Sequence, residues 1–259
     1  MLYQRVLTGI IGGAFFLLLV YVGGYGFLIL FSVLALVAYS ELIGMRSDPY
    51  FSVQSIIGYA FVLMLLLFGT ETSTYLLLGL FLLLSVPVVT KNRLSYSDIS
   101  YYGMGALYIG LSLHAAVLIR LHLEHGLYLF LFVLLCIWAS DTMAYFVGGL
   151  FKGPKLWPAI SPNKTFSGAL GGLFGSSAVG YAFFLWQGLG HPLSHWMVLA
   201  IGISLVGQIG DFVESAIKRS LHVKDSGVLL PGHGGVLDRF DSLLFASPFA
   251  YHVFVCLGF

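Results

Sequence analysis

The sequence predicts an all-α fold, a polytopic integral membrane bundle of about nine transmembrane helices. Hydrophobic residues make up 59% of the chain and charged residues only 9%, whereas a soluble domain carries roughly 25% charged residues. So few charged side chains cannot cover a water-facing surface, and we therefore expect most of the protein surface to face lipid. The apolar residues form continuous runs near the roughly 20 residues that a helix needs to cross a bilayer. A transmembrane β-barrel would instead alternate in polarity over segments of about ten residues.

Nine stretches approach the length of a membrane-spanning helix. The breaks between them carry turn residues such as Gly23-Gly24 and Ser47-Asp48-Pro49. Very little chain separates the first two stretches, which predicts a tight helical hairpin. The nine stretches are residues 6–22, 25–43, 51–68, 74–89, 101–119, 127–148, 165–186, 196–220 and 241–259.

The positions of Lys and Arg predict the orientation of the chain. With a cytoplasmic N-terminus and nine crossings, eleven of the twelve Lys and Arg fall on the cytoplasmic side and only Arg120 falls outside. Membrane proteins carry such an excess in their cytoplasmic loops, and one missed or extra crossing would split the basic residues. The C-terminus is then expected outside. We expect a single membrane domain over residues 1–259, with low polarity in 1–126 and most unusual polar residues in 127–259.

Charge, histidine and cysteine usage exclude several classes of function. The formal net charge is +1, and binding to nucleic acid needs concentrated positive charge. The eight histidines form no metal-ligand spacing such as HExxH. Cys136 and Cys256 lie inside apolar runs without a CxxC pair, so both are expected to pack as small hydrophobic side chains.

Charged residues concentrate between positions 211 and 241, which hold nine of the chain's 23 charged side chains. Carboxylates inside membrane segments are costly and point to function. Spacings of three, four and seven residues place Glu214, Ser215 and Lys218 on the helix face of Asp211, and this face should line a polar cavity. Further carboxylates at the expected cytoplasmic ends of other stretches are Asp141, Asp238 and Asp241.

Three causes could account for these carboxylates. They could pair with bases in a structural network, carry protons in a transporter, or hold a divalent cation such as Mg²⁺, which prefers carboxylate and phosphate oxygens. Basic residues alternate with the acids, which favours a site that handles phosphate, because bases neutralise phosphate charge. These bases are Lys218, Arg219, Lys224 and Arg239.

Several other motifs admit a functional and a structural interpretation. Residues 231–235 (Pro-Gly-His-Gly-Gly) could let the backbone approach a ligand or form a simple turn. Residues 161–165 precede a helix whose N-terminus would suit an anion near Lys164, or they cap that helix. We expect Glu41 to be an interfacial residue and His114 a buried hydrogen-bonding one. Small residues at helical spacing predict close helix packing, at Gly168, Gly171, Gly172 and Gly175.

The ordered run of charged and glycine residues resembles the signature of the phosphatidate cytidylyltransferases, or CDP-diacylglycerol synthases. The matching blocks are residues 215–219 (SAIKR), Lys224-Asp225 and residues 230–241 (LPGHGGVLDRFD). Upstream, Ser140-Asp141 and residues 160–165 (ISPNKT) are similar to further blocks of that family. The resemblance covers roughly residues 140–241, and the chain departs from the family pattern at Met143 and Ser167.

The resemblance implies an enzyme that combines CTP with the membrane lipid phosphatidate, giving CDP-diacylglycerol and pyrophosphate. It also implies nine transmembrane helices, a homodimer, a bacterial-type cytoplasmic membrane and Mg²⁺; whether a monovalent cation such as K⁺ joins the Mg²⁺ stays open. The orientation predicted from Lys and Arg places the site on the cytoplasmic side. The implied metal ligands are Asp211, Asp238 and Asp241. Roles in catalysis are assigned to Lys218, Arg219, Lys224, Asp225, His233 and Arg239. Roles in substrate binding are assigned to Asp141, Asn163, Lys164, Glu214, Ser215, Gly234 and Gly235.

Two other functions stay open. A membrane secondary transporter would show internal symmetry and broken helices, and no repeat of fixed period is visible in the sequence. A CTP-dependent kinase that acts on a polyprenol or another lipid would share the membrane setting and the nucleotide.

Overall fold

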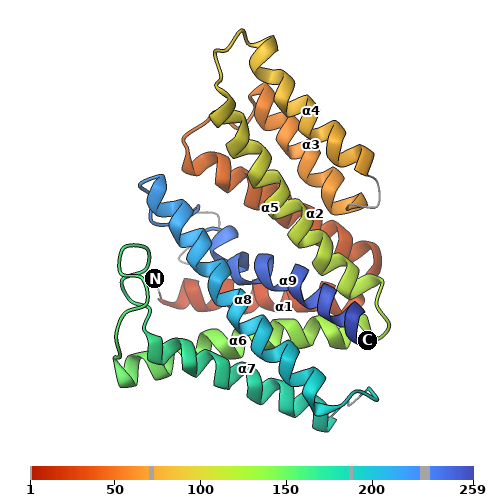
Figure 1. The fold of residues 1–259 in the computed structure, drawn as a ribbon, viewed down its shortest axis with the longest axis vertical. Helices are drawn as coiled ribbons and strands as arrows, with labels where there is room; N and C mark the ends of the chain where they lie inside the picture. The colour runs from red at the N-terminus through yellow and green to blue at the C-terminus, as the bar shows by residue number, and fades with distance from the viewer. Residues whose placement is uncertain (1, 70–72, 187–188, 228–233) are drawn as a thin grey trace. The chain divides into compact units, whose positions relative to one another are not determined.

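The fold is all-helical, as the sequence predicts (Figure 1). The computed structural model describes residues 2–69, 73–186, 189–227 and 234–259. Within these ranges there are nine helices and no β-strand, apart from one isolated bridge between Lys155 and Thr165. The helices are α1 (Leu2–Val22), α2 (Gly24–Met45), α3 (Val53–Phe68), α4 (Ser73–Val89), α5 (Tyr96–Leu121), α6 (Gly126–Phe151), α7 (Phe166–Trp186), α8 (Leu193–Ser220) and α9 (Leu237–Leu257).

The helices are those of an integral membrane protein. In the part of the chain that the structure describes, α2 and α5 to α9 are long and apolar enough to cross a bilayer. The apolar portions of the other three helices are shorter, at Gly9–Val22, Val53–Phe68 and Leu76–Val89. The membrane class is therefore confirmed, with six described helices long and apolar enough to span a bilayer. A count of nine crossings stays a prediction.

Several helices begin earlier than their apolar runs predict, and in α5 and α9 side chains cap the first turn. The predicted start of α5 at residue 101 is wrong by one and a half turns, since the helix begins at Tyr96. There Ser95 Oγ accepts the Asp98 N–H at 3.2 Å and Asp98 Oδ2 accepts the Ser95 N–H at 2.8 Å, a reciprocal capping box. The helix α9 likewise begins at Leu237 rather than at residue 241.

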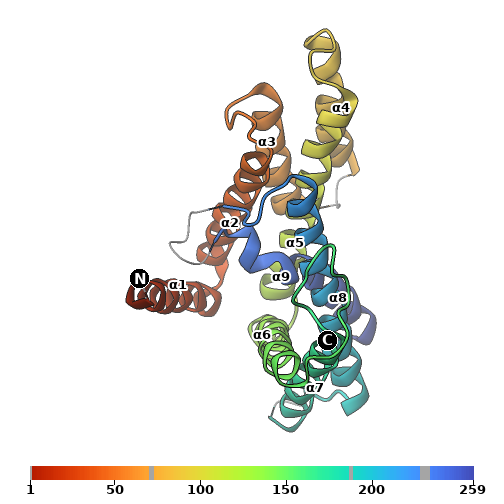
Figure 2. The same ribbon diagram turned by 90° about the vertical axis from the view of Figure 1, so that its left-hand side faces the viewer.

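The chain forms two compact units, Met1–Val117 with Leu221–Arg239, and Leu118–Ser220 with Phe240–Phe259. In the first unit, α1 packs on α2, α2 on α3, and α3 on α4 (Figures 1 and 2). Buried aromatic and aliphatic side chains fill its interior, and the Tyr39 hydroxyl donates to the Tyr102 carbonyl at 3.2 Å. The largest of these fully buried side chains include Phe27, Phe31, Tyr39, Phe61 and Leu65.

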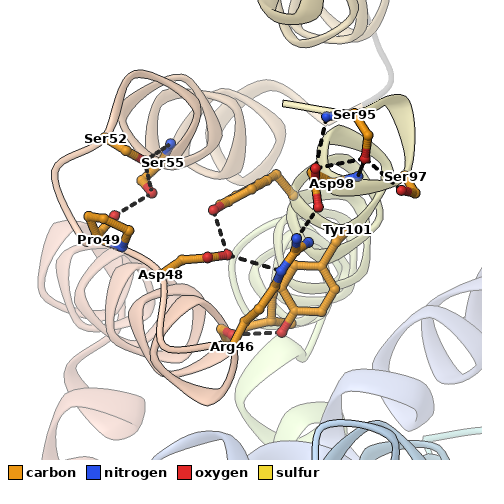
Figure 3. A network of polar contacts seen from close by, with 11 residues as sticks. Arg46, Asp48, Pro49, Ser52, Ser55, Ser95, Ser97, Asp98 and Tyr101 are labelled. Carbon is orange, nitrogen blue, oxygen red and sulfur yellow. Dashed lines mark hydrogen bonds and ion pairs between the residues drawn. The ribbon is translucent and has the colours of Figure 1, made fainter. Parts of the chain in front are cut away.

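An arginine at the end of α2 ties this helix to the first turn of α5 (Figure 3). Arg46 pairs with Asp98 and, at 3.2 Å, with Asp48. The hydrogen bond to Asp98 raises the pKa of the Arg46 guanidinium. The Tyr102 hydroxyl donates to Asp48 at 2.7 Å, and the Tyr101 hydroxyl donates to the Leu42 carbonyl at 2.6 Å. These contacts give Arg46, Asp48 and Asp98 each an opposite charge, and Asp48 a hydroxyl donor as well.

In the second unit, α6 and α7 run side by side, and both contact α8 (Figures 1 and 2). The close approach of α6 and α7 depends on glycine, as the sequence predicts. A side-chain carbon on Gly171 would lie 2.9 Å from the Met143 carbonyl oxygen, and one on Gly175 would lie 2.6 Å from the Ala139 carbonyl oxygen. Such distances leave no room for a methyl group, so these glycines set the spacing of the two helices.

Replacing Gly175 by alanine should therefore destabilise the protein. We expect Gly175→Ala to lower the free energy of unfolding by about 1–3 kcal/mol, because the added methyl overpacks the α6–α7 contact. Gly149 is the matched control, since a side-chain carbon there meets nothing within 4 Å. Gly149→Ala should raise stability by about 0.5–1 kcal/mol through the better helix propensity of alanine. Unfolding in detergent would measure both, and equal stability of the two variants would contradict this account.

Candidate active site

Three carboxylates from three different helices gather in the second unit. Asp141 comes from α6, Asp211 from α8 and Asp241 from α9. The charge of Asp211 acts on both other carboxylates, and Asp141 also acts on Asp241. The ammonium of Lys164 acts on both Asp141 and Asp241 with the opposite sign. The structure thus brings together four of the residues that the sequence assigns to metal or substrate binding.

Lys164 is held over this cluster by the loop that precedes α7. Its ammonium pairs with the Asp211 carboxylate and lies 4.4 Å from the centre of the Phe212 ring. The Leu156 N–H donates to the Lys164 carbonyl at 3.1 Å, which closes the loop on itself. Thr165 then caps α7, because its Oγ1 accepts the Gly168 N–H at 3.1 Å. The loop therefore fixes where the lysine charge sits relative to α8.

The departure from the family pattern at Ser167 has a local role in this loop. Ser167 Oγ accepts the Gly153 N–H at 3.3 Å and lies 3.1 Å from Thr165 Oγ1. The serine joins the start of the loop to the first turn of α7.

The cluster suits a hard divalent cation by its chemistry. The negative charges of Asp141, Asp211 and Asp241 outnumber the one positive charge of Lys164, and carboxylate oxygens are donors that Mg²⁺ prefers. Among the described residues, no group of three or more His, Cys, Asp or Glu is arranged as a metal site. Asp211 is instead engaged by Lys164. A cation held by Asp211 would therefore compete with the lysine for the same carboxylate.

A second ion pair lies one turn further along α8. Glu214 and Lys218 pair at i, i+4, with only 1% and 12% of their side chains exposed. Ser215 Oγ lies 3.4 Å from Asp211 Oδ1. The polar face predicted for this helix thus consists of a partly exposed aspartate with its serine and a buried glutamate with its lysine.

Asp238, the third predicted metal ligand, is described in the first unit. Its Oδ2 accepts three hydrogen bonds at 2.9 Å, from the N–H and the hydroxyl of Ser226 and from the N–H of Gly235. Gly234 has a φ of 81°, and a side-chain carbon there would lie 2.8 Å from Asp238 Oδ2. Asp238 therefore organises the backbone around the start of α9.

The remaining predicted site residues are on the surface or outside the described ranges. Lys155 Nζ donates to the Asn163 carbonyl at 3.2 Å, and Arg219 Nε donates to the Ile160 carbonyl at 3.3 Å. His233 lies outside the described residues. The exposed members of the predicted set are Asp141, Asn163, Arg219, Lys224, Asp225 and Arg239.

The interfacial position predicted for Glu41 is wrong. It was expected at the interface, but only 7% of it is exposed, and its carboxylate accepts hydrogen bonds from the backbone of Val236 and Leu237. The signal that could have revealed it is a single carboxylate in an otherwise apolar stretch. His114 contacts the Leu66 carbonyl through Nδ1 at 2.7 Å, as predicted, but it is half-buried rather than buried.

A cavity of about 590 Å³ lies in the first unit, beside Glu41. Its described lining includes two carboxylates and no Lys or Arg, so it does not suit a triphosphate. The lining comprises Val37, Ser40, Glu41, Gly44, Met45, Tyr50, Phe51, Tyr59, Val223, Asp225, Ser226 and Gly227.

Comparison with known proteins extends the resemblance well beyond residues 140–241. The model of the cytidylyltransferase family matches residues 3–257. This chain belongs to the cytidylyltransferase family. A phosphatidate cytidylyltransferase from Bacillus subtilis (strain 168) is 39% identical over 257 residues, which cover 96% of both chains. Proteins of the same name from Staphylococcus aureus (strain COL) and Staphylococcus haemolyticus are 38% and 39% identical over 253 residues, covering 94% of this chain and 95% of each relative.

In this cytidylyltransferase, the buried pair on α8 should be sensitive to loss of one partner. Lys218→Met leaves the Glu214 carboxylate buried without its ammonium, which we expect to lower the free energy of unfolding by about 3–5 kcal/mol. The double variant Glu214→Gln/Lys218→Met should recover most of that loss. Glu124→Gln is the control, because 86% of that side chain is exposed. Chemical unfolding in detergent measures the four proteins, and a single variant as stable as the double one would contradict this account.

Proposed function

We propose that this chain transfers a cytidylyl group from CTP to phosphatidate, giving CDP-diacylglycerol and pyrophosphate for phospholipid biosynthesis. The relatives that match almost its whole length carry the name phosphatidate cytidylyltransferase. The observation that supports the chemistry is the cluster of Asp141, Asp211 and Asp241 beside Lys164. Carboxylates at helix positions within apolar sequence point to function, and a lysine in the loop beside them suits a site for phosphates.

The proposed reaction is an in-line displacement at phosphorus. An oxygen of the phosphatidate phosphate forms a bond to the α-phosphorus of CTP, and the bond from that phosphorus to the bridging oxygen of pyrophosphate breaks. The attacking oxygen is already an anion near neutral pH, so no protein base has to remove a proton. The main obstacle is repulsion between two anions, and fixed positive charge lowers it. Lys164 is the cation best placed in the second unit for this task, with Lys218, Arg219, Lys224 and Arg239 as further candidates.

Mg²⁺ is the proposed cofactor. The residues that would hold it are Asp211 and Asp241, with Asp141 beside them and Asp238 as the further ligand that the family resemblance implies. When bound, the cation would neutralise charge on the triphosphate and the leaving pyrophosphate. Release of Lys164 from Asp211 would free its ammonium for a phosphate oxygen.

The proposed setting is a bacterial-type cytoplasmic membrane with the site facing the cytoplasm. Nine crossings with the N-terminus inside and the C-terminus outside would place eleven of the twelve Lys and Arg on the cytoplasmic side. CTP would then arrive from the cytoplasm, and phosphatidate would arrive from the membrane. The family resemblance further suggests a homodimer.

One experiment separates this function from a lipid kinase and from a transporter. The purified chain in vesicles is given Mg²⁺, phosphatidate or a polyprenol, and CTP labelled on either the α- or the γ-phosphorus. We expect the α-label in lipid with phosphatidate, because the cytidylyl group carries that phosphorus. The γ-label in a polyprenol would instead support a kinase. No label in any lipid would refute both enzymes and favour the transporter.

Asp211→Asn should abolish most of the Mg²⁺-dependent transfer. Removing the charge of this carboxylate weakens both the proposed cation site and the placement of Lys164, and we expect the rate to fall by about 100-fold or more. The folded fraction should stay near wild type, because Asp211 is partly exposed. Glu124→Gln is again the matched change from carboxylate to amide and should keep full activity. Full turnover of Asp211→Asn at unchanged Mg²⁺ dependence would refute the assignment.

A further inference from the structure

The carboxylate of Glu41 in α2 caps the start of α9, which follows almost 200 residues later. Its Oε1 accepts the Val236 N–H at 2.8 Å, and its Oε2 accepts the Leu237 N–H at 2.8 Å. The first N–H groups of a helix have no partner within the helix, and its positive N-terminal end favours a carboxylate. Glu41 therefore supplies, from another helix, the acceptors for two N–H groups at the start of α9.

Ser226 links this cap to Asp238. Its hydroxyl lies 3.1 Å from Glu41 Oε2 and 2.9 Å from Asp238 Oδ2. A hydroxyl has one hydrogen to donate, so the two carboxylates share a single donor. Because Asp238 Oδ2 also accepts the N–H groups of Ser226 and Gly235, one network joins α2, the segment 221–227 and the first turn of α9.

Two glycines let the backbone approach Glu41 closely. A side-chain carbon on Gly227 would lie 2.7 Å from Glu41 Oε1, and one on Gly235 would lie 2.5 Å from Glu41 Oε2. Any larger residue at either position would push the backbone away from the carboxylate. The segments around Gly227 and Gly235 thus both pack against the Glu41 carboxylate. Both carboxylate oxygens of Glu41 are used as acceptors.

We propose that Glu41 is a positioning residue for cytidylyl transfer, which fixes the orientation of Asp238 through Ser226 and the backbone of the first turn of α9. The proposal rests on the proposed function, in which Asp238 belongs to the reacting site. The Glu41 carboxylate is buried and already accepts three hydrogen bonds from the protein. We therefore assign it to positioning and not to contact with substrate. A purely structural residue would change stability alone, whereas a positioning residue changes the rate of the folded enzyme.

The first arm of the test needs no substrate. Glu41→Gln keeps the size of the side chain but replaces one acceptor oxygen by an NH₂ group, which cannot accept a hydrogen bond. Hydrogen exchange followed by mass spectrometry should show about tenfold faster exchange in residues 234–241, the equivalent of one lost hydrogen bond. Exchange in α6 and α7 should stay unchanged. Unchanged exchange in residues 234–241 would overturn the proposal.

The second arm separates kcat from KM. We expect kcat per folded molecule of Glu41→Gln to fall by about 10- to 100-fold, as a displaced catalytic group does, while KM for CTP stays within about twofold of wild type. Glu124→Gln, the same chemical change at an exposed position, should alter neither constant. A wild-type kcat in the folded variant would overturn the proposal.

Ser226→Ala keeps the proposal testable if Glu41→Gln does not fold. It removes only the shared hydroxyl and keeps the Ser226 N–H on Asp238, so kcat should fall by about 3- to 10-fold with faster exchange in the same residues. If both single variants fold, their effects on kcat should be less than multiplicative, because they act through one network. A Ser226→Ala variant with the kcat of the wild-type enzyme would overturn the proposal. A wild-type chain that transfers no cytidylyl group would instead refute the proposed function.

Discussion

Hydrocarbon offers no hydrogen-bond partner, so each buried polar group of this chain has to find one within the protein. This constraint explains why its few carboxylates occupy such defined positions. Asp98 caps α5 and binds Arg46, Glu41 caps α9, and Glu214 pairs with Lys218. Asp98 and Glu41 join segments that are distant in the sequence, so their contacts locate helix ends. The Glu214–Lys218 pair instead lies within α8.

The two carboxylates near the start of α9, Glu41 and Asp238, engage a different kind of donor from Asp211. In the first unit, Glu41 and Asp238 accept backbone N–H groups and a serine hydroxyl. In the second unit, Asp211 forms an ion pair with the side-chain ammonium of Lys164. Backbone donors are fixed by the fold and make a rigid structure, whereas an ammonium can exchange one anion for another. The second kind of contact is the one suited to phosphate chemistry.

Glycine has two separate structural uses in this molecule. On α7 it lets α6 approach closely, with backbone carbonyl oxygens where side-chain carbons would otherwise lie. Before α9, Gly227 and Gly235 let the backbone reach a carboxylate of the same protein. A glycine-rich stretch therefore does not by itself indicate a ligand, because a carboxylate on another helix makes the same demand for space.

The sequence by itself determined the helical membrane class, the approximate place of each helix and the membership of a catalytic family, because apolar runs and ordered motifs are local properties of the chain. It also identified the unusual acids at Asp141, Asp211 and Asp241. Only the tertiary structure decided that Lys164 engages Asp211, that Glu41 is buried, and that α9 begins at Leu237. The physical reason is that a charge or an N–H group selects its partner by proximity in space, and no local periodicity encodes a contact between residues almost 200 positions apart.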